Sequence, residues 1–264
     1  MNGKLKNSLA IAGFLSIMTL TTVNAAPYNI TESGDFTVGN YSNITTSNQG
    51  NGGVIQNSGY NLNVLTGTSF TNNILETTNQ AVFGGAIYQV GGNLTIQNGV
   101  TFDGNRIIGS EQTYPGWSGV DSPSGGAIYA ISTQNLNIGD DVKFLNNVVS
   151  NGVDGGESNG GAIFLQGVSS VTMGNVEFSG NSANTRGGAI YNGDSALTIN
   201  GTGVFSDNTA KTGGAIYMYD VTGTTVTSTG VGTEFNSNNA TGNGGAVANF
   251  DSTFNVGKNN TFSG

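Results

Sequence analysis

Apolar and polar positions alternate along the chain in short runs, and the same pattern returns many times. Each copy opens with a Gly-Gly pair, and apolar residues follow the first Gly at +3, +10, +12 and +18. In one copy these positions are Gly84, Gly85, Ile87, Leu94, Ile96 and Phe102. Alternating runs broken by Gly, Asn and Asp, with no helical period, predict short half-buried strands.

The copy that opens at Gly84 predicts three strands, at 86–89, 93–97 and 100–103. Short strands repeated at constant internal spacing are typical of a parallel β-helix. We therefore predict an all-β fold: a single-stranded parallel β-helix, a three-sided solenoid of about seven to eight coils. Crossovers between parallel strands are right-handed as a rule, so the solenoid is expected to be right-handed.

The repeat joins two motifs, Gly-Gly-Ala-Ile and Phe-x-x-Asn. The step from the first Gly to the Phe is 18 residues in five of seven copies, 19 in the third and 22 in the sixth. The step from Phe to the next Gly-Gly pair varies from 8 to 23 residues. Three complete copies are Gly84, Gly85, Phe102 and Asn105; Gly125, Gly126, Phe144 and Asn147; and Gly187, Gly188, Phe205 and Asn208.

We interpret these motif residues as mainly structural. Glycine suits a sharp corner, because it has no Cβ and accepts a positive φ. The Phe side chains are expected to stack in the core, and each burial is worth roughly 1.5–3 kcal/mol. Asn suits a tight turn, so the Asn side chains are expected to form a ladder between coils. Insertions between Asn and the next Gly-Gly pair should leave the solenoid at one corner.

Three segments follow from this pattern. Residues 1–25 resemble a secretory signal peptide, with two lysines, an apolar run and small residues before a cleavage point after Ala25. Residues 26–51 lack a Gly-Gly pair and are expected to be a degenerate N-terminal capping coil. Residues 52–264 form the repeat region. Since the Asn of the last motif would be residue 265, we expect a fragment or a truncated product with an open end that favours self-association.

Composition narrows the function classes. The chain has 16 acidic and 7 basic residues, no Cys and no His. An acidic chain has no electrostatic attraction to nucleic acid, and the mature part shows no membrane span. We predict no cofactor, no metal site and no catalytic residues. A β-helical polysaccharide-acting enzyme is the alternative, but the cations and carboxylates are dispersed over different coil positions and do not form a convergent catalytic set.

The insertion at 106–124 is the candidate binding loop. It holds Tyr114, the single Trp of the chain, Trp117, and Asp121. Exposed loop aromatics are favoured contact residues. The alternative is that Trp117 folds down over the base of the loop. A second loop, 154–157, has carboxylates suited to Ca²⁺ but no ordered ligand series, so a solvated loop is favoured.

The paired motifs, such as Phe102-Asp103-Gly104-Asn105 and Phe178-Ser179-Gly180-Asn181, resemble the repeat of chlamydial-type polymorphic outer-membrane proteins. The resemblance covers about residues 52–264. It implies an autotransporter: a signal peptide, a right-handed β-helical passenger and a membrane β-barrel. It further implies a surface adhesin whose paired motifs take part in host-cell binding. This chain departs from that pattern because it has no barrel segment and no Cys.

We therefore expect an exported, non-enzymatic, adhesin-like passenger segment at the cell surface, in the outer membrane or outside the cell. Its partner would be a cell-surface protein or glycan. The alternative is a structural or self-associating β-helical surface protein whose Thr, Asn and Ser faces bind no specific ligand.

Overall fold

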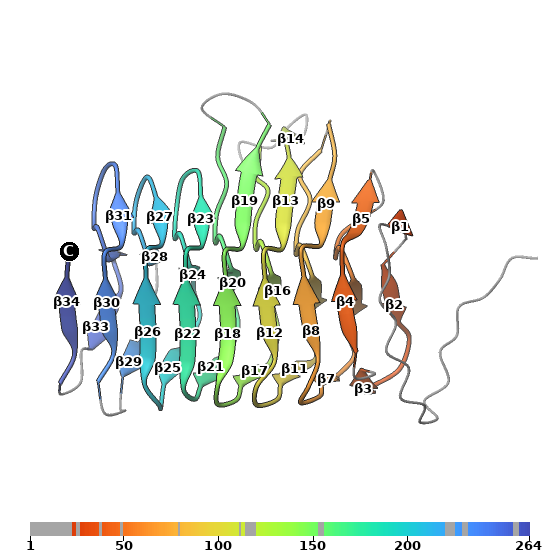
Figure 1. Cartoon of the computed structure of the whole chain (residues 1–264), viewed down its shortest axis with the longest axis horizontal. Coiled ribbons are helices and arrows are strands. Elements are labelled where there is room, and N and C mark those ends of the chain that lie inside the picture. The colour runs from red at the N-terminus through yellow and green to blue at the C-terminus, as the bar shows by residue number, and fades with distance from the viewer. Residues whose placement is uncertain are drawn as a thin grey trace, which may run out of the picture.

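A computed structural model describes residues 23–24, 27–36, 39–47, 50–78, 80–110, 112–113, 120–152, 156–219, 225–228, 232–255 and 259–264. Every helix or strand assigned within these ranges is a β-strand. The strands stack along the long axis of the molecule (Figure 1), and their partners in neighbouring coils run parallel. The fold is therefore a parallel β-helix, as the repeat predicted.

Four parallel sheets of eight strands each run along the axis, and we call them A to D. A coil passes from B through C and D to A. Sheet B contains β2 (Tyr28–Ile30), β6 (Ile55–Ser58), β10 (Ile87–Val90), β16 (Ile128–Ile131), β20 (Ile163–Gln166), β24 (Ile190–Gly193), β28 (Ile216–Tyr219) and β32 (Val247–Phe250). Sheet C contains β3 (Gly34–Phe36), β7 (Leu62–Val64), β11 (Asn93–Ile96), β17 (Asn135–Ile138), β21 (Ser170–Met173), β25 (Leu197–Ile199), β29 (Thr225–Ser228) and β33 (Thr253–Asn255).

The other two sheets follow in the same order along the chain. Sheet D contains β4 (Asn40–Ser42), β8 (Ser69–Thr71), β12 (Thr101–Asp103), β18 (Val142–Leu145), β22 (Val176–Ser179), β26 (Gly203–Ser206), β30 (Glu234–Asn236) and β34 (Thr261–Ser263). Sheet A contains β1 (Val23–Asn24), β5 (Ile44–Ser47), β9 (Ile74–Glu76), β13 (Arg106–Gly109), β19 (Val148–Asn151), β23 (Ser182–Ala183), β27 (Thr209–Ala210) and β31 (Asn239–Ala240). A separate antiparallel pair joins β14 (Gln112–Thr113) to β15 (Val120–Asp121).

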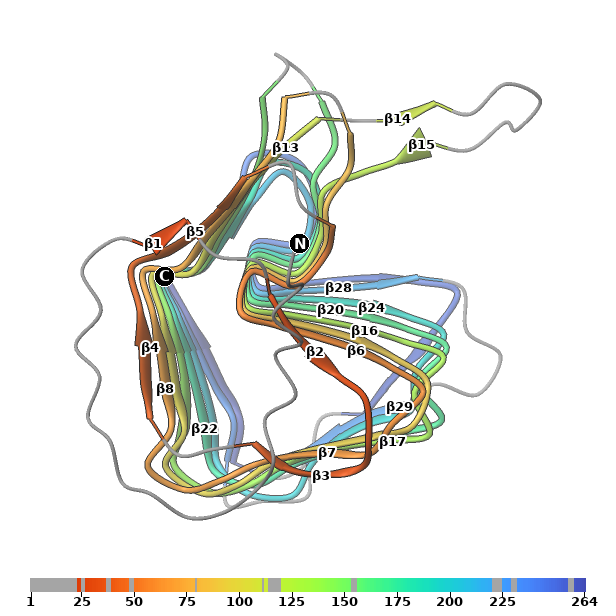
Figure 2. The same cartoon turned by 90° about the vertical axis from the view of Figure 1, so that its right-hand side faces the viewer.

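Sheets B, C and D enclose a triangular core, and sheet A projects from the corner between D and B (Figure 2). In this view the N-terminal coils face the reader, and each coil turns clockwise as the chain recedes. A clockwise turn that moves away from the viewer is a right-handed helix. The predicted handedness and the three-sided core are therefore both present.

The prediction of three strands per coil was incomplete, because sheet A adds a fourth. Its strands begin one residue or so after the motif Asn, in the stretch that the sequence pattern marked as free in length. The second residue after each Asn is apolar and points inward, as with Leu75, Ile107 and Val149. Their partners are in register from coil to coil, so this stretch extends the solenoid outward before its length begins to vary.

A continuous column of Phe rings fills the core beside sheet D. Neighbouring ring centroids lie 4.7–5.0 Å apart and the planes differ by 1–11° from Phe70 to Phe262. Phe70, Phe102, Phe144, Phe178 and Phe205 are fully buried. Constant Gly-to-Phe spacing keeps these rings in register, since each Phe pairs with the Phe of the next coil across sheet D.

The Gly-Gly pair makes the corner where the arm returns to sheet B. The first Gly has a positive φ, 72° in Gly84, which side chains with a Cβ rarely adopt. The second Gly faces the same residue of the next coil, and a Cβ on Gly85 would overlap the carbonyl oxygen of Gly126. Both glycines are therefore required by the backbone, which accounts for their recurrence without a binding role.

Candidate functional site

Sheet A and the segments that return from it to sheet B form a projection that we call the arm. It stands well clear of the triangular core in Figure 2. A small apolar cluster of its own, Leu75, Val82, Ile107 and Val149, is buried between its two sides. In later coils the matching inward residues are small, namely Ala183 and Ala210, and their sheet A strands have two residues each. The arm is therefore longest in the coils that carry the long insertions.

A ladder of Asn side chains separates the arm from the Phe column. The Nδ2 of Asn105 donates to the Oδ1 of Asn147 at 3.0 Å and to the carbonyl oxygen of Phe70 at 2.9 Å. The Oδ1 of Asn147 also accepts the backbone N–H of Asn105 at 3.0 Å. The same contacts recur along the chain at Asn73, Asn105, Asn147, Asn181, Asn208 and Asn238.

The first coil departs from this ladder. Ile44 occupies the position of the Asn, and only its backbone N–H donates, at 3.1 Å, to the Oδ1 of Asn73. From Asn73 to Asn208 the rungs are fully buried. Buried amides that bond only to their neighbours hold the corner in place and leave no group for a ligand. The motif Phe and Asn are thus interior residues in this structure.

A second aromatic column lies on the outer face of sheet B, where the arm meets the core. It runs through Tyr88, Tyr129, Phe164, Tyr191 and Tyr217, with ring centroids 4.6–5.5 Å apart and planes within 19°. These are the aromatic residues that follow each Gly-Gly-Ala-Ile motif. Because each ring covers the face of the next, the column presents ring edges to the outside.

The orientation of these rings limits what the outer column can bind. A sugar ring that stacks on an aromatic side chain needs an open face, and the stacked faces here are occupied. Tyr129, Phe164 and Tyr217 are also 7–9% exposed. The return segment packs against the column, with the ring of Phe83 4.6 Å from that of Tyr129. We therefore assign this column to fastening the arm to the core.

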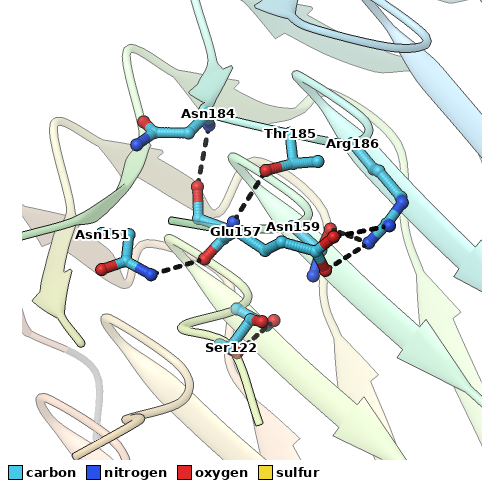
Figure 3. Close-up of polar contacts among 9 residues, drawn as sticks. Ser122, Asn151, Glu157, Asn159, Asn184, Thr185 and Arg186 are labelled. Atoms are coloured by element: carbon cyan, nitrogen blue, oxygen red, sulfur yellow. Dashed lines mark hydrogen bonds and ion pairs between the residues drawn. The ribbon is translucent and has the colours of Figure 1, made fainter. Parts of the chain in front are cut away.

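A polar cluster closes the base of the arm (Figure 3). Both Nη atoms of Arg186 donate to the carboxylate of Glu157, at 2.8 and 2.9 Å, and Nη1 also reaches the Oδ1 of Asn159 at 3.3 Å. The guanidinium lies 5.8 Å from the ring centre of Tyr217. The neighbouring Ser158 donates its hydroxyl to the carbonyl of Val149 at 3.0 Å. These contacts tie the 156–159 segment to sheet A and to the outer column.

Electrostatics at this cluster follow from burial and from the ion pair. Burial acts to lower the pKa of Arg186, but the hydrogen bonds and charge of Glu157 outweigh it and raise that pKa above its ordinary value. Burial, with a smaller effect of Tyr217, raises the pKa of Tyr191 to about 12. The outer column therefore stays uncharged well above neutral pH, and Arg186 stays cationic.

The antiparallel hairpin β14–β15 extends from the end of the arm, on the same side of the molecule as sheet B (Figure 2). Two of the candidate binding residues, Tyr114 and Trp117, lie outside the described residues. Asp121 is the last residue of β15, where its backbone pairs with Gln112. Asp154 of the candidate Ca²⁺ loop also lies outside the described part, whereas Glu157 pairs with Arg186. The structure thus supplies the platform for the predicted loop but not its side-chain geometry.

Sequence reasoning missed the arm cluster and the Glu157–Arg186 pair. The apolar residue two positions after each Asn was the available signal for the arm. The pair joins residues 29 positions apart in two coils with arms of different length, so no fixed spacing marks it. Within the described ranges, no three side chains gather as metal ligands, and no helix is long and apolar enough to cross a bilayer.

Comparison with known proteins identifies the repeat. Residues 175–193 and 202–218 match the model of the Chlamydia polymorphic membrane protein repeat. The chain carries repeats of this family. Each matched stretch spans one Phe-x-x-Asn motif and one Gly-Gly-Ala-Ile motif. The family repeat therefore runs from sheet D, around the arm corner, into sheet B. No curated protein and no solved structure gave a significant match to the chain.

Proposed function

We propose that this chain is an exported, surface-displayed, adhesin-like passenger segment of an autotransporter-type protein. Two findings support a place at the bacterial surface: the polymorphic membrane protein repeat, and the β-helix it builds. The segment 1–25, most of which lies outside the described residues, remains the proposed signal peptide. We propose further that the protein binds a surface protein or glycan of another cell and catalyses no reaction.

The observation that carries this proposal is the arm. Its coils share the core spacing of every other coil, yet they add a separate apolar cluster and a hairpin held away from the solenoid. A rigid scaffold that holds an extended loop is a common arrangement for recognition. Since the motif Phe and Asn are buried, the arm is the better candidate for contact with a partner.

The test replaces residues 111–121 by a two-residue Gly-Ser bridge in the full chain. This bridge keeps all of β13, whose Ile107 belongs to the arm cluster. Binding of the fluorescently labelled chain to cultured epithelial cells is measured by flow cytometry. We expect the replacement to abolish most of the binding. Equal binding by both chains would refute the role of the hairpin, and no binding by the unaltered chain would refute adhesion.

A matched control keeps the hairpin and alters the other side of the solenoid. Lys143 and Glu177 form an exposed ion pair on sheet D, 2.9 Å apart. Exposed pairs contribute about 0–1 kcal/mol, so Lys143→Gln should leave both fold and cell binding unchanged. Size-exclusion chromatography of the same samples detects self-association. Cell binding that appears only in an aggregated fraction would favour the self-associating structural protein instead.

A further inference from the structure

The outer face of sheet C differs from the other outer faces of the solenoid. Its central outward column consists of short uncharged hydrogen-bonding side chains from the second coil onward. Among the residues whose side chains are described, these are Asn63, Thr95, Asn137, Thr172, Thr198 and Asn255. Sheet B carries aromatic rings on its outer face, and sheet D carries Lys143 and Glu177. Sheet C thus presents an uncharged polar surface.

Hydrogen bonds between coils fix several of these side chains. The Nδ2 of Asn135 donates to the Oδ1 of Asn93 at 2.8 Å, and the hydroxyl of Thr172 donates to the Oδ1 of Asn137 at 2.9 Å. Side chains that are already fixed lose less conformational entropy when a ligand binds. The face therefore holds its polar groups in one arrangement before any contact is made.

One hollow of about 390 Å³ opens on this face, beside the corner between sheets C and D. Its polar lining comes from Thr66, Thr95, Gln97, Asn98 and Asn137. The hollow arises from a change in side-chain size between two coils. Gln97 follows β11, whereas the residue that follows β17 is a glycine, Gly139. A Cβ on that glycine would overlap the Oδ1 of Asn98, so the position accepts no larger residue.

The polar groups of this hollow are only partly used by the protein. The Oε1 of Gln97 accepts from the backbone N–H and the hydroxyl of Thr66, at 3.2 and 3.3 Å. Among the hydrogen bonds of the described residues, none is donated by the Nδ2 of Asn98, the Nδ2 of Asn137 or the hydroxyl of Thr95. Three donors therefore line a hollow of the size that small ligands occupy, about 300–1,000 Å³.

We propose that this hollow binds an uncharged glycan. Amide and hydroxyl donors match sugar hydroxyls, which donate and accept in turn. The lining has no cation, and the chain carries a net charge of −9, so acidic sugars are disfavoured. The lining also has no aromatic ring, so recognition runs through hydrogen bonds. This site names one ligand class for the adhesin proposed above and rests on that function only for its biological purpose.

The test places the full folded chain on an array of neutral, sialylated and sulfated oligosaccharides, followed by titration calorimetry with the best neutral one. We expect binding to neutral sugars alone. Asn137→Ala should weaken it about tenfold, because one sugar hydrogen bond of about 1.4 kcal/mol is lost. Thr198→Ala alters the same column two coils away and should leave affinity unchanged. Circular dichroism checks that both variants fold.

The outcomes separate this site from the hairpin. Unchanged affinity in Asn137→Ala, an equal loss in Thr198→Ala, or equal binding of sulfated sugars would overturn the proposal. A chain that adheres to cells but binds no neutral sugar on the array would overturn it too, while adhesion through the hairpin would stand. Neutral-sugar binding that survives replacement of residues 111–121 and falls in Asn137→Ala would support it.

Discussion

The triangular core and the arm are built from the same coils but are stabilised very differently. The core cluster runs without a break from Phe36 to Phe235, so each coil packs against the two beside it. The arm cluster has four residues, drawn from the second, third and fourth coils. The core residues keep their spacing in every coil, whereas the arm varies in length. Constant spacing is required only where side chains must stack on one another, and the arm is released from that constraint.

The Asn ladder is the border between the two regions. Inside it the Phe column fixes the register, and outside it the chain length changes from coil to coil. The ladder satisfies the backbone at the corner whatever the arm does beyond it, because its partners are other ladder residues and Phe carbonyls. An insertion in the arm therefore leaves the core undisturbed, which is what a display scaffold requires.

The largest effect is expected from opening the core. Phe144→Ala removes a fully buried ring stacked between Phe102 and Phe178, at a cost of about 3–5 kcal/mol in unfolding free energy. Thermal and denaturant unfolding followed by circular dichroism measure it. Phe262→Ala is the matched control, since that ring is 52% exposed and stacks on Phe235 alone. Similar losses in both variants would contradict the stacked-core account.

A smaller loss is expected at the border. Asn147→Asp keeps the shape but removes the Nδ2 that donates to the carbonyl of Phe102 and to the Oδ1 of Asn181. Buried groups left without partners cost about 1–3 kcal/mol. Asn238→Asp should cost less, because Asn238 is only partly buried and its Nδ2 donates to Phe205 alone. If the two variants unfold at the same denaturant concentration, the ladder is not the stabilising border we describe.

Breaking the arm alone should leave the core almost unaffected. Ile107→Ala empties the centre of the arm cluster, so β13 and its neighbour β9 should open more often. Amide hydrogen exchange of these strands is expected to accelerate, while exchange in sheets B, C and D and the global unfolding midpoint stay near those of the unaltered chain. Ala210→Gly, in a coil with a short arm, is the control. Faster exchange throughout the molecule would show that arm and core unfold together.

The smallest effect concerns the joint between arm and core at high pH. The folded chain raises the pKa of Tyr191 from 10 to about 12, so it stabilises the neutral phenol. That contribution is complete below pH 10 and is lost as the pH rises towards 12. Tyrosinate absorbance should therefore report a late-titrating group, and stability should fall across this window. Tyr191→Phe should remove the late group and part of the fall, with little change at neutral pH. A Tyr191 that titrates near pH 10 would contradict this.

Much of the architecture follows from residue spacing. Three strands at 86–89, 93–97 and 100–103 are observed as β10, β11 and β12, with boundaries shifted by one residue or so. The Phe column and the Asn ladder follow because a fixed step of 18 residues returns each residue type to the same place in the coil. The fourth sheet was missed, since its strands lie where the repeat loses its constant length, although the apolar residue two positions beyond each Asn marks it.

The sequence by itself therefore determined the parts of this protein that repeat: the strand types, the corner glycines, the inward Phe and Asn, and the membrane-protein repeat family. Only the tertiary structure decided which residues of different coils meet. The pair of Glu157 and Arg186, the arm cluster, and the hollow between Gln97 and Asn137 each join neighbouring coils. The number of residues between such partners depends on the arms in between, so contacts of this kind leave no constant spacing in the chain.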